Sequence, residues 1–144
     1  MPIYPKQENY LFHVGRYFAV EWFYTQEGHL PAYEHYLTLT DEDKDRLKFL
    51  AKYIADNPYG TLLPKTMYRV EDRDNKIYAF KPDAHRFFNF MTDRAKMIIT
   101  NAYRKHAQQM TKADLELLRQ AVRFKTDYLN RVKEGTYYEN QTRV

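Results

Sequence analysis

Cationic side chains stand at the ends of three apolar segments in the second half of the chain. These cations are Lys81, Arg86 and Lys105. Short runs of β-branched and aromatic residues, separated by turn formers, predict a strand meander. Neighbouring strands would bring the three cations into one neighbourhood. Cations grouped on a sheet with aromatic neighbours favour a surface that binds or cleaves RNA.

The elements that must position these cations follow from apolar spacing and turn residues. Thr40 is a suitable N-cap for a helix whose apolar residues follow at helical spacing, and Thr111 is suited to cap a long helix over 113–132 that Gly135 ends. A short helix is expected over 31–39. We expect strands over 17–24, 67–70, 77–81, 85–91 and 96–103.

This order of strand, helices, strands and helix predicts one α+β domain over residues 1–144. Residues 1–15 are expected to form a loose arm, and residues 136–144 a frayed tail. The chain has no cysteine, which excludes disulfides and thiol catalysis and fits a reducing cytoplasm. We expect no metal site, no secretion signal and no membrane span.

The net charge of +4 is unevenly distributed. Residues 65–106 contain ten Lys and Arg against five Asp and Glu, so the excess lies in the meander and the segment before it. A concentrated basic region favours a polyanionic partner. Its alternative is a sheet edge on which cations block aggregation.

Segments 77–81, 85–90 and 98–106 together resemble the phage-derived HigB branch of the RelE toxin superfamily. Arg86 and Lys105 match the family pattern directly. The sequence departs from it elsewhere: Lys81 replaces an arginine, Ala79 a glutamate, Tyr103 a phenylalanine, and His106 a second lysine. Thr111 stands where the family usually has proline. The similarity in element order extends over about residues 17–133.

The resemblance implies a small antiparallel sheet, helices packed on one face and a long C-terminal helix. It also implies a cytoplasmic toxin of a type II toxin-antitoxin system that cleaves messenger RNA, usually on the ribosome. The expected chemistry is attack of a ribose 2′-OH on the neighbouring phosphate, which requires no metal or other cofactor. The expected partner is an antitoxin, for which a small helix-turn-helix protein is the natural candidate.

Each candidate residue has a role in that chemistry. The planar guanidinium of Arg86 matches phosphate oxygens, and Lys81 and Lys105 add positive charge. His106 titrates near neutrality and suits proton transfer, while Tyr103 could stack on a base or hold a proton. We expect further RNA contacts from Lys65, Arg69, His85 and Arg104.

Other interpretations of the same residues stay open. Arg86 could pair with Asp83 or Asp93 across a turn, and either His85 or His106 could be purely structural. The whole chain could instead be a non-catalytic phage or plasmid regulator of the same fold that binds a partner. It could also be an unrelated nucleic-acid-binding module.

Overall fold

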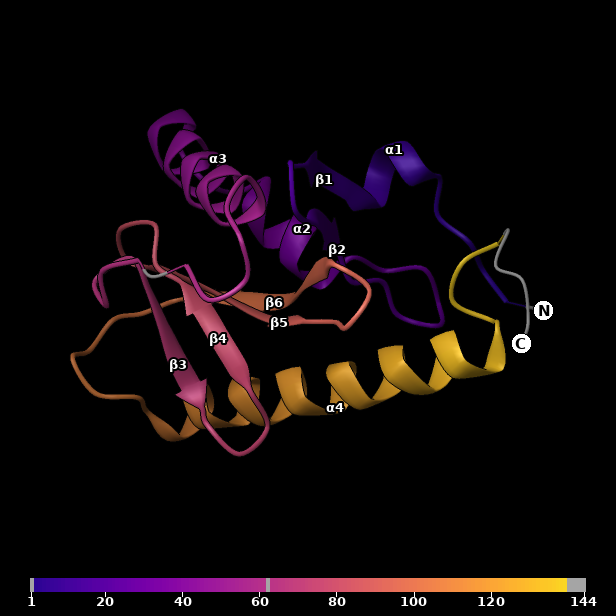
Figure 1. The fold of residues 1–144 in the computed structure, drawn as a ribbon. Coiled ribbons are helices and arrows are strands. Elements are labelled where there is room, and N and C mark those ends of the chain that lie inside the picture. The colour runs from indigo at the N-terminus through magenta and orange to yellow at the C-terminus, as the bar shows by residue number, and fades with distance from the viewer. Residues whose placement is uncertain (1, 62, 140–144) are drawn as a thin grey trace.

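The computed structural model describes residues 2–61 and 63–139, and these fold around one six-stranded sheet (Figure 1). The sheet order is β1-β2-β6-β5-β4-β3. Strands β2 and β6 are parallel, and the other neighbouring pairs are antiparallel. The strands are β1 (Leu11–Val14), β2 (Ala19–Trp22), β3 (Tyr68–Asp72), β4 (Ile77–Phe80), β5 (His85–Met91) and β6 (Lys96–Arg104).

Helices cover both faces of this sheet. Figure 1 shows α2 and α3 on one side, and α4 running along the other. A single turn, α1, precedes β1. The helices are α1 (Gln7–Tyr10), α2 (Pro31–Tyr36), α3 (Asp41–Ala55) and α4 (Lys112–Glu134). No helix of the described chain is both long enough and apolar enough to cross a membrane.

Alternating residues of the central strands supply two separate cores. In β5, Phe87 packs with α2 and α3, whereas Phe88 and Phe90 pack with α4. In β6, Ile99 belongs to the first core and Ile98 to the second. Because side chains of a strand alternate between the faces, near-continuous apolar runs need cover on both sides.

The expected α+β class and the long C-terminal helix are confirmed. The arrangement differs in two respects from the one that the resemblance implied. The sheet is mixed, because β6 returns across the sheet to lie parallel to β2. Helices pack on both faces rather than one, because both faces of β5 and β6 are apolar.

Both long helices begin at the expected caps. The Thr40 hydroxyl accepts a hydrogen bond from the Asp43 backbone N–H, and Thr111 forms a reciprocal capping box with Asp114. These bonds satisfy N–H groups that have no partner within the helix. Gly135 ends α4 at φ 75°, a conformation that glycine adopts without steric cost.

The two ends of the chain are more ordered than the sequence predicts. Instead of a loose arm, residues 1–15 include α1 and β1, and β1 pairs with β2. Of the segment expected to fray, residues 136–139 fold back on the sheet, where Tyr137 is fully buried. Burial of this aromatic side chain explains the difference. Residues 1 and 140–144 lie outside the described part of the chain.

Candidate functional site

Strand register places Arg86 and Tyr103 beside each other on the face that α4 covers. The two residues are direct partners across β5 and β6. The Tyr103 ring lies 5.6 Å from that of Phe88, which belongs to the core beneath α4. Arg86 precedes Phe88 by two residues and therefore shares its face. Arg86 thus stands at the edge of the α4 core, where β5 begins.

Neighbouring strands add cations to the same face. Arg69 of β3 pairs with Ala79 of β4, and Lys81 follows Ala79 by two residues. The pKa of the Lys81 ammonium is lowered, first by burial and then by the charges of Arg86, Arg69 and Lys105. Together with the strand register, these charge effects group the three expected cations with Arg69. We call Arg69, Lys81, Arg86 and Lys105 the cation cluster.

The two central cations of this cluster are held by carbonyl oxygens. One Arg86 guanidinium nitrogen donates to the carbonyls of Asp83 and His85, each at 2.8 Å. The Lys81 ammonium donates to the Lys65 carbonyl at 3.2 Å. The expected alternative, an ion pair of Arg86 with Asp83 or Asp93, is absent from the described residues. A carbonyl orients a cation but leaves its net charge uncancelled.

The sequence reasoning did not identify Glu71, the carboxylate that lies among these cations. Its side chain is 11% exposed, and one of its oxygens lies 3.4 Å from Arg69 Nε. Its charge opposes the lowering of the pKa values of Lys81 and Arg86. Alternation alone does not place Glu71, because the pairing of β3 with β4 shifts between Val70 and Asp72; its 3.4 Å contact with Arg69 does. The strand expected over 67–70 stops one residue short of Glu71.

Tyr103 keeps its proton at neutral pH. Burial, followed by the charge of Asp114, raises the pKa of its phenol to about 12. Only 8% of the residue is exposed. Tyr103 therefore serves this site as a neutral wall and hydrogen-bonding group rather than as a base. Asp114 comes from the first turn of α4, so this helix begins next to the cation cluster.

The other predicted RNA contacts lie around the cluster or outside it. Lys65 is exposed and offers its carbonyl to Lys81. Arg104 is exposed at the end of β6, opposite His85 in the strand register. His106 is exposed in the loop after β6. Exposure leaves these side chains accessible to a ligand, but the fold does not fix them as it fixes Arg86.

His85 lies on the opposite face of the sheet from Arg86. Its Nδ1 is 2.8 Å from Nε2 of His35 in α2, and its Nε2 is 3.8 Å from the carboxylate of Asp43 in α3. The side chain is only 13% exposed. The structure therefore places His85 apart from Arg86, because adjacent residues of a strand point to opposite faces, and its predicted contact with RNA stays a prediction.

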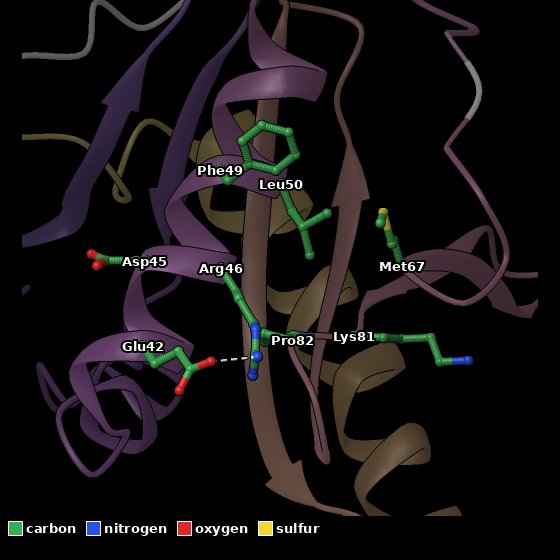
Figure 2. Close-up of a pocket in the computed structure, with 8 residues that line it drawn as sticks. All are labelled: Glu42, Asp45, Arg46, Phe49, Leu50, Met67, Lys81 and Pro82. Carbon is green, nitrogen blue, oxygen red and sulfur yellow. Dashed lines mark hydrogen bonds and ion pairs between the residues drawn. The ribbon is translucent and has the colours of Figure 1, made fainter.

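A pocket of about 470 Å³ opens between α3 and the end of β4 (Figure 2). In this view Phe49 and Arg46 extend from α3, while the Lys81 side chain points away from both. The walls of the pocket are mainly apolar, and the Phe49 residue is 60% exposed. Lys81 therefore connects this pocket with the cation cluster. The lining residues are Glu42, Asp45, Arg46, Phe49, Leu50, Met67, Lys81 and Pro82.

Within residues 2–61 and 63–139, no three His, Asp or Glu side chains are grouped as a metal site requires. Comparison with models of known protein families gave no match, and comparison with curated proteins gave none.

Proposed function

We propose that this chain is a RelE/HigB-type endoribonuclease that cleaves messenger RNA, with ribosome-bound messenger as its substrate. The observation that carries the proposal is the cation cluster, whose central members keep their net charge among carbonyl partners. A phosphate diester in the middle of this cluster would supply the missing negative charge. Such a site stabilises charge that develops on a phosphorane.

The proposed reaction is attack of the ribose 2′-oxygen on the adjacent phosphorus. The new O2′–P bond forms as the P–O5′ bond breaks, which leaves a 2′,3′-cyclic phosphate and a 5′-hydroxyl. We assign the phosphorane contact to Arg86, because its planar fork binds two phosphate oxygens at once. Lys105 and Arg69 supply additional positive charge around the phosphate.

Proton transfer falls to Lys81 of the cation cluster and to Glu71, which lies beside Arg69. We assign Glu71 as the base that takes the 2′-OH proton, since a carboxylate is ionised near neutrality. Lys81 is the acid that protonates the leaving 5′-oxygen. Its pKa is lowered by burial and by neighbouring cations, which makes its ammonium a better proton donor than an ordinary lysine.

The resemblance expects a glutamate at position 79, where this chain has alanine. Arg69 is the strand partner of Ala79, and Glu71 lies close to Arg69. We infer that Glu71 brings the required carboxylate from the neighbouring strand. An antitoxin that covers the cation cluster would silence the enzyme, and action on ribosomes places the protein in the cytoplasm.

The test is cleavage of a defined messenger by purified protein with translating ribosomes. Wild-type protein is expected to give fragments with 2′,3′-cyclic phosphate ends, and Arg86→Ala combined with Lys105→Ala is expected to remove cleavage. The matched control is Arg119→Ala combined with Lys133→Ala on the exposed side of α4. If the Arg86/Lys105 double variant still stops the growth of cells that produce it, the alternative of a non-catalytic regulator is favoured. Steeply salt-dependent binding of free RNA or DNA without cleavage would favour an unrelated nucleic-acid-binding module.

A further inference from the structure

A chain of partly buried polar side chains joins three elements on the α2/α3 face. His35 Nε2 of α2 lies 2.8 Å from His85 Nδ1 of β5. His85 Nε2 faces an Asp43 oxygen at 3.8 Å, and the other Asp43 oxygen accepts from Arg46 at 2.8 Å. The Asp43 side chain is 10% exposed. The chain therefore ties the start of β5 to the beginning of α3 and to α2.

The neighbours determine where the protons of the two imidazoles reside. The Asp43 carboxylate favours a proton on the facing Nε2 of His85. Neutral His85 then has a bare Nδ1, which accepts a hydrogen bond from the Nε2–H of His35. This hydrogen bond requires that one of the two facing ring nitrogens is unprotonated. If both imidazoles are protonated, two N–H groups and two positive charges face each other and the bond is lost.

His85 also contacts the cation cluster through its backbone. Its carbonyl accepts a hydrogen bond from the Arg86 guanidinium at 2.8 Å. The side chain and the carbonyl of one residue thus serve opposite faces of the sheet. Fixing the ring through His35 and Asp43 would therefore also restrict the movement of the carbonyl that Arg86 contacts.

We propose that His35 and His85 are positioning residues for Arg86, and that double protonation of this pair releases the guanidinium from its place in the cation cluster. The proposal rests on the proposed function for the use of Arg86, but the coupling itself is a property of the protein without substrate. The two histidines touch no substrate and act only through the His85 carbonyl.

The groups around the His35–His85 pair determine at which pH the two imidazoles become protonated. Burial, and then His85, lower the pKa of His35 to about 4. Burial also lowers the pKa of His85, against the opposing effects of Asp43 from α3 and Asp83 from the turn before β5. Arg104 of β6 and Arg86 lower it further. The pair therefore stays intact at neutral pH and is lost in stronger acid.

The experiment compares His35→Leu with His35→Gln at pH 7.5, 6.0 and 4.5. Glutamine retains a side-chain N–H donor toward His85 but cannot become charged. We expect His35→Leu to lower cleavage by about 10- to 100-fold at pH 7.5, because small misplacements of a catalytic group are costly. His35→Gln should cleave as wild type does at pH 7.5. Its Arg86 side-chain N–H signal in NMR should remain unchanged between pH 6.0 and 4.5, whereas the wild-type signal moves.

The control is His29→Gln, in an exposed histidine of the loop after β2, which should follow the wild-type pH dependence. Near-ultraviolet circular dichroism at each pH confirms that Trp22 stays packed. If the wild type cleaves no RNA, the proposed function fails, yet the Arg86 signal still reports the coupling. Arg86 signals that respond to pH identically in wild type and His35→Gln would overturn the proposal. If His35→Leu fails to fold, His35→Gln alone decides the outcome.

Discussion

The two ends of α4 lie over two groups of cations whose side chains have different partners. Near its C-terminus, Lys96 is 3.0 Å from the buried Glu21, and Arg131 is 3.1 Å from Asp127. Near its N-terminus, Lys81 and Arg86 are held by carbonyl oxygens. Lys96 and Arg131 are thus neutralised within the fold, whereas in the cation cluster only Arg69, among the described residues, is paired with a carboxylate, that of Glu71. Cations oriented but not neutralised are the ones that a ligand phosphate can complete.

Near the C-terminal end of α4, tyrosine side chains form hydrogen bonds with one another and with the sheet. The Tyr138 hydroxyl donates to Glu21 at 2.6 Å and shares a 2.7 Å hydrogen bond with the Tyr128 hydroxyl. The Tyr24 hydroxyl donates to the Tyr137 carbonyl. The guanidinium of Arg131 lies 4.6 Å from the centre of the Tyr137 ring. We call Tyr24, Tyr128, Tyr137, Tyr138 and Arg131 the tyrosine latch, because these residues join the segment after α4 to the sheet.

The largest expected effect is a loss of folding stability when a residue of the tyrosine latch is removed. Tyr137→Ala should lower the free energy of unfolding by about 3–5 kcal/mol, because it removes a fully buried ring and a hydroxyl that accepts from the Tyr24 N–H. The urea midpoint measures the loss. Tyr59→Ala, at a residue 76% exposed, should change stability by less than about 0.5 kcal/mol. Equal losses in the two variants would show that residues 136–139 are not part of the core.

Substitution of Glu71, beside the cation cluster, should change the rate of RNA cleavage rather than folding stability. Glu71→Gln is expected to lower the rate of cleavage by about 100-fold or more, the usual contribution of a general base. Its urea midpoint should change little, since the lost ion pair with Arg69 is partly exposed. Asp74→Asn, on the exposed β3–β4 turn, is the matched control. Full activity of Glu71→Gln would assign the base to another group.

The smallest expected effect is a dependence of folding stability on pH. The unfolded chain protonates histidine near pH 6.5, whereas the pKa of folded His35 is about 4. The unfolded state therefore binds more protons between these values, and stability falls as the pH drops through this window. Discounted for partial exposure, His35 should contribute about 1 kcal/mol between pH 7 and 5. Urea midpoints of wild type and His35→Gln should differ in slope against pH, and identical slopes would contradict this assignment.

Apart from α1 and β1, the sequence predicts the strands and helices well because their signals are local. Thr40, Thr111 and Gly135 act within one helical turn, so the ends of α3 and α4 can be read directly. The second helical layer was also visible in principle. Phe87, Phe88 and Phe90 break the alternation expected of a strand with one exposed face, which indicates cover on both sides.

What could not be predicted depends on contacts between distant segments. Alternation along the strand separates His85 from Arg86, but which of the two residues lies on the side of the cation cluster depends on the strand register, because a shift by one residue exchanges the faces. The pair with His35 joins residues fifty positions apart. The burial of Tyr137 depends on Tyr24, which lies 113 positions away in the chain, and a prediction from the sequence has no local signal for that contact. Polar composition alone made residues 136–139 resemble a tail.

The most direct test of the contrast between the two ends is NMR mapping with a short RNA whose 2′-hydroxyls are methylated and which therefore cannot be cleaved. We predict that RNA shifts the signals of Arg86, Arg69 and Tyr103 and leaves those of Lys96 and Arg131 in place. Raising the salt concentration should weaken this binding steeply. Shifts centred on Lys96 and Arg131, or none at Arg86, would contradict the assignment of the cation cluster as the RNA site.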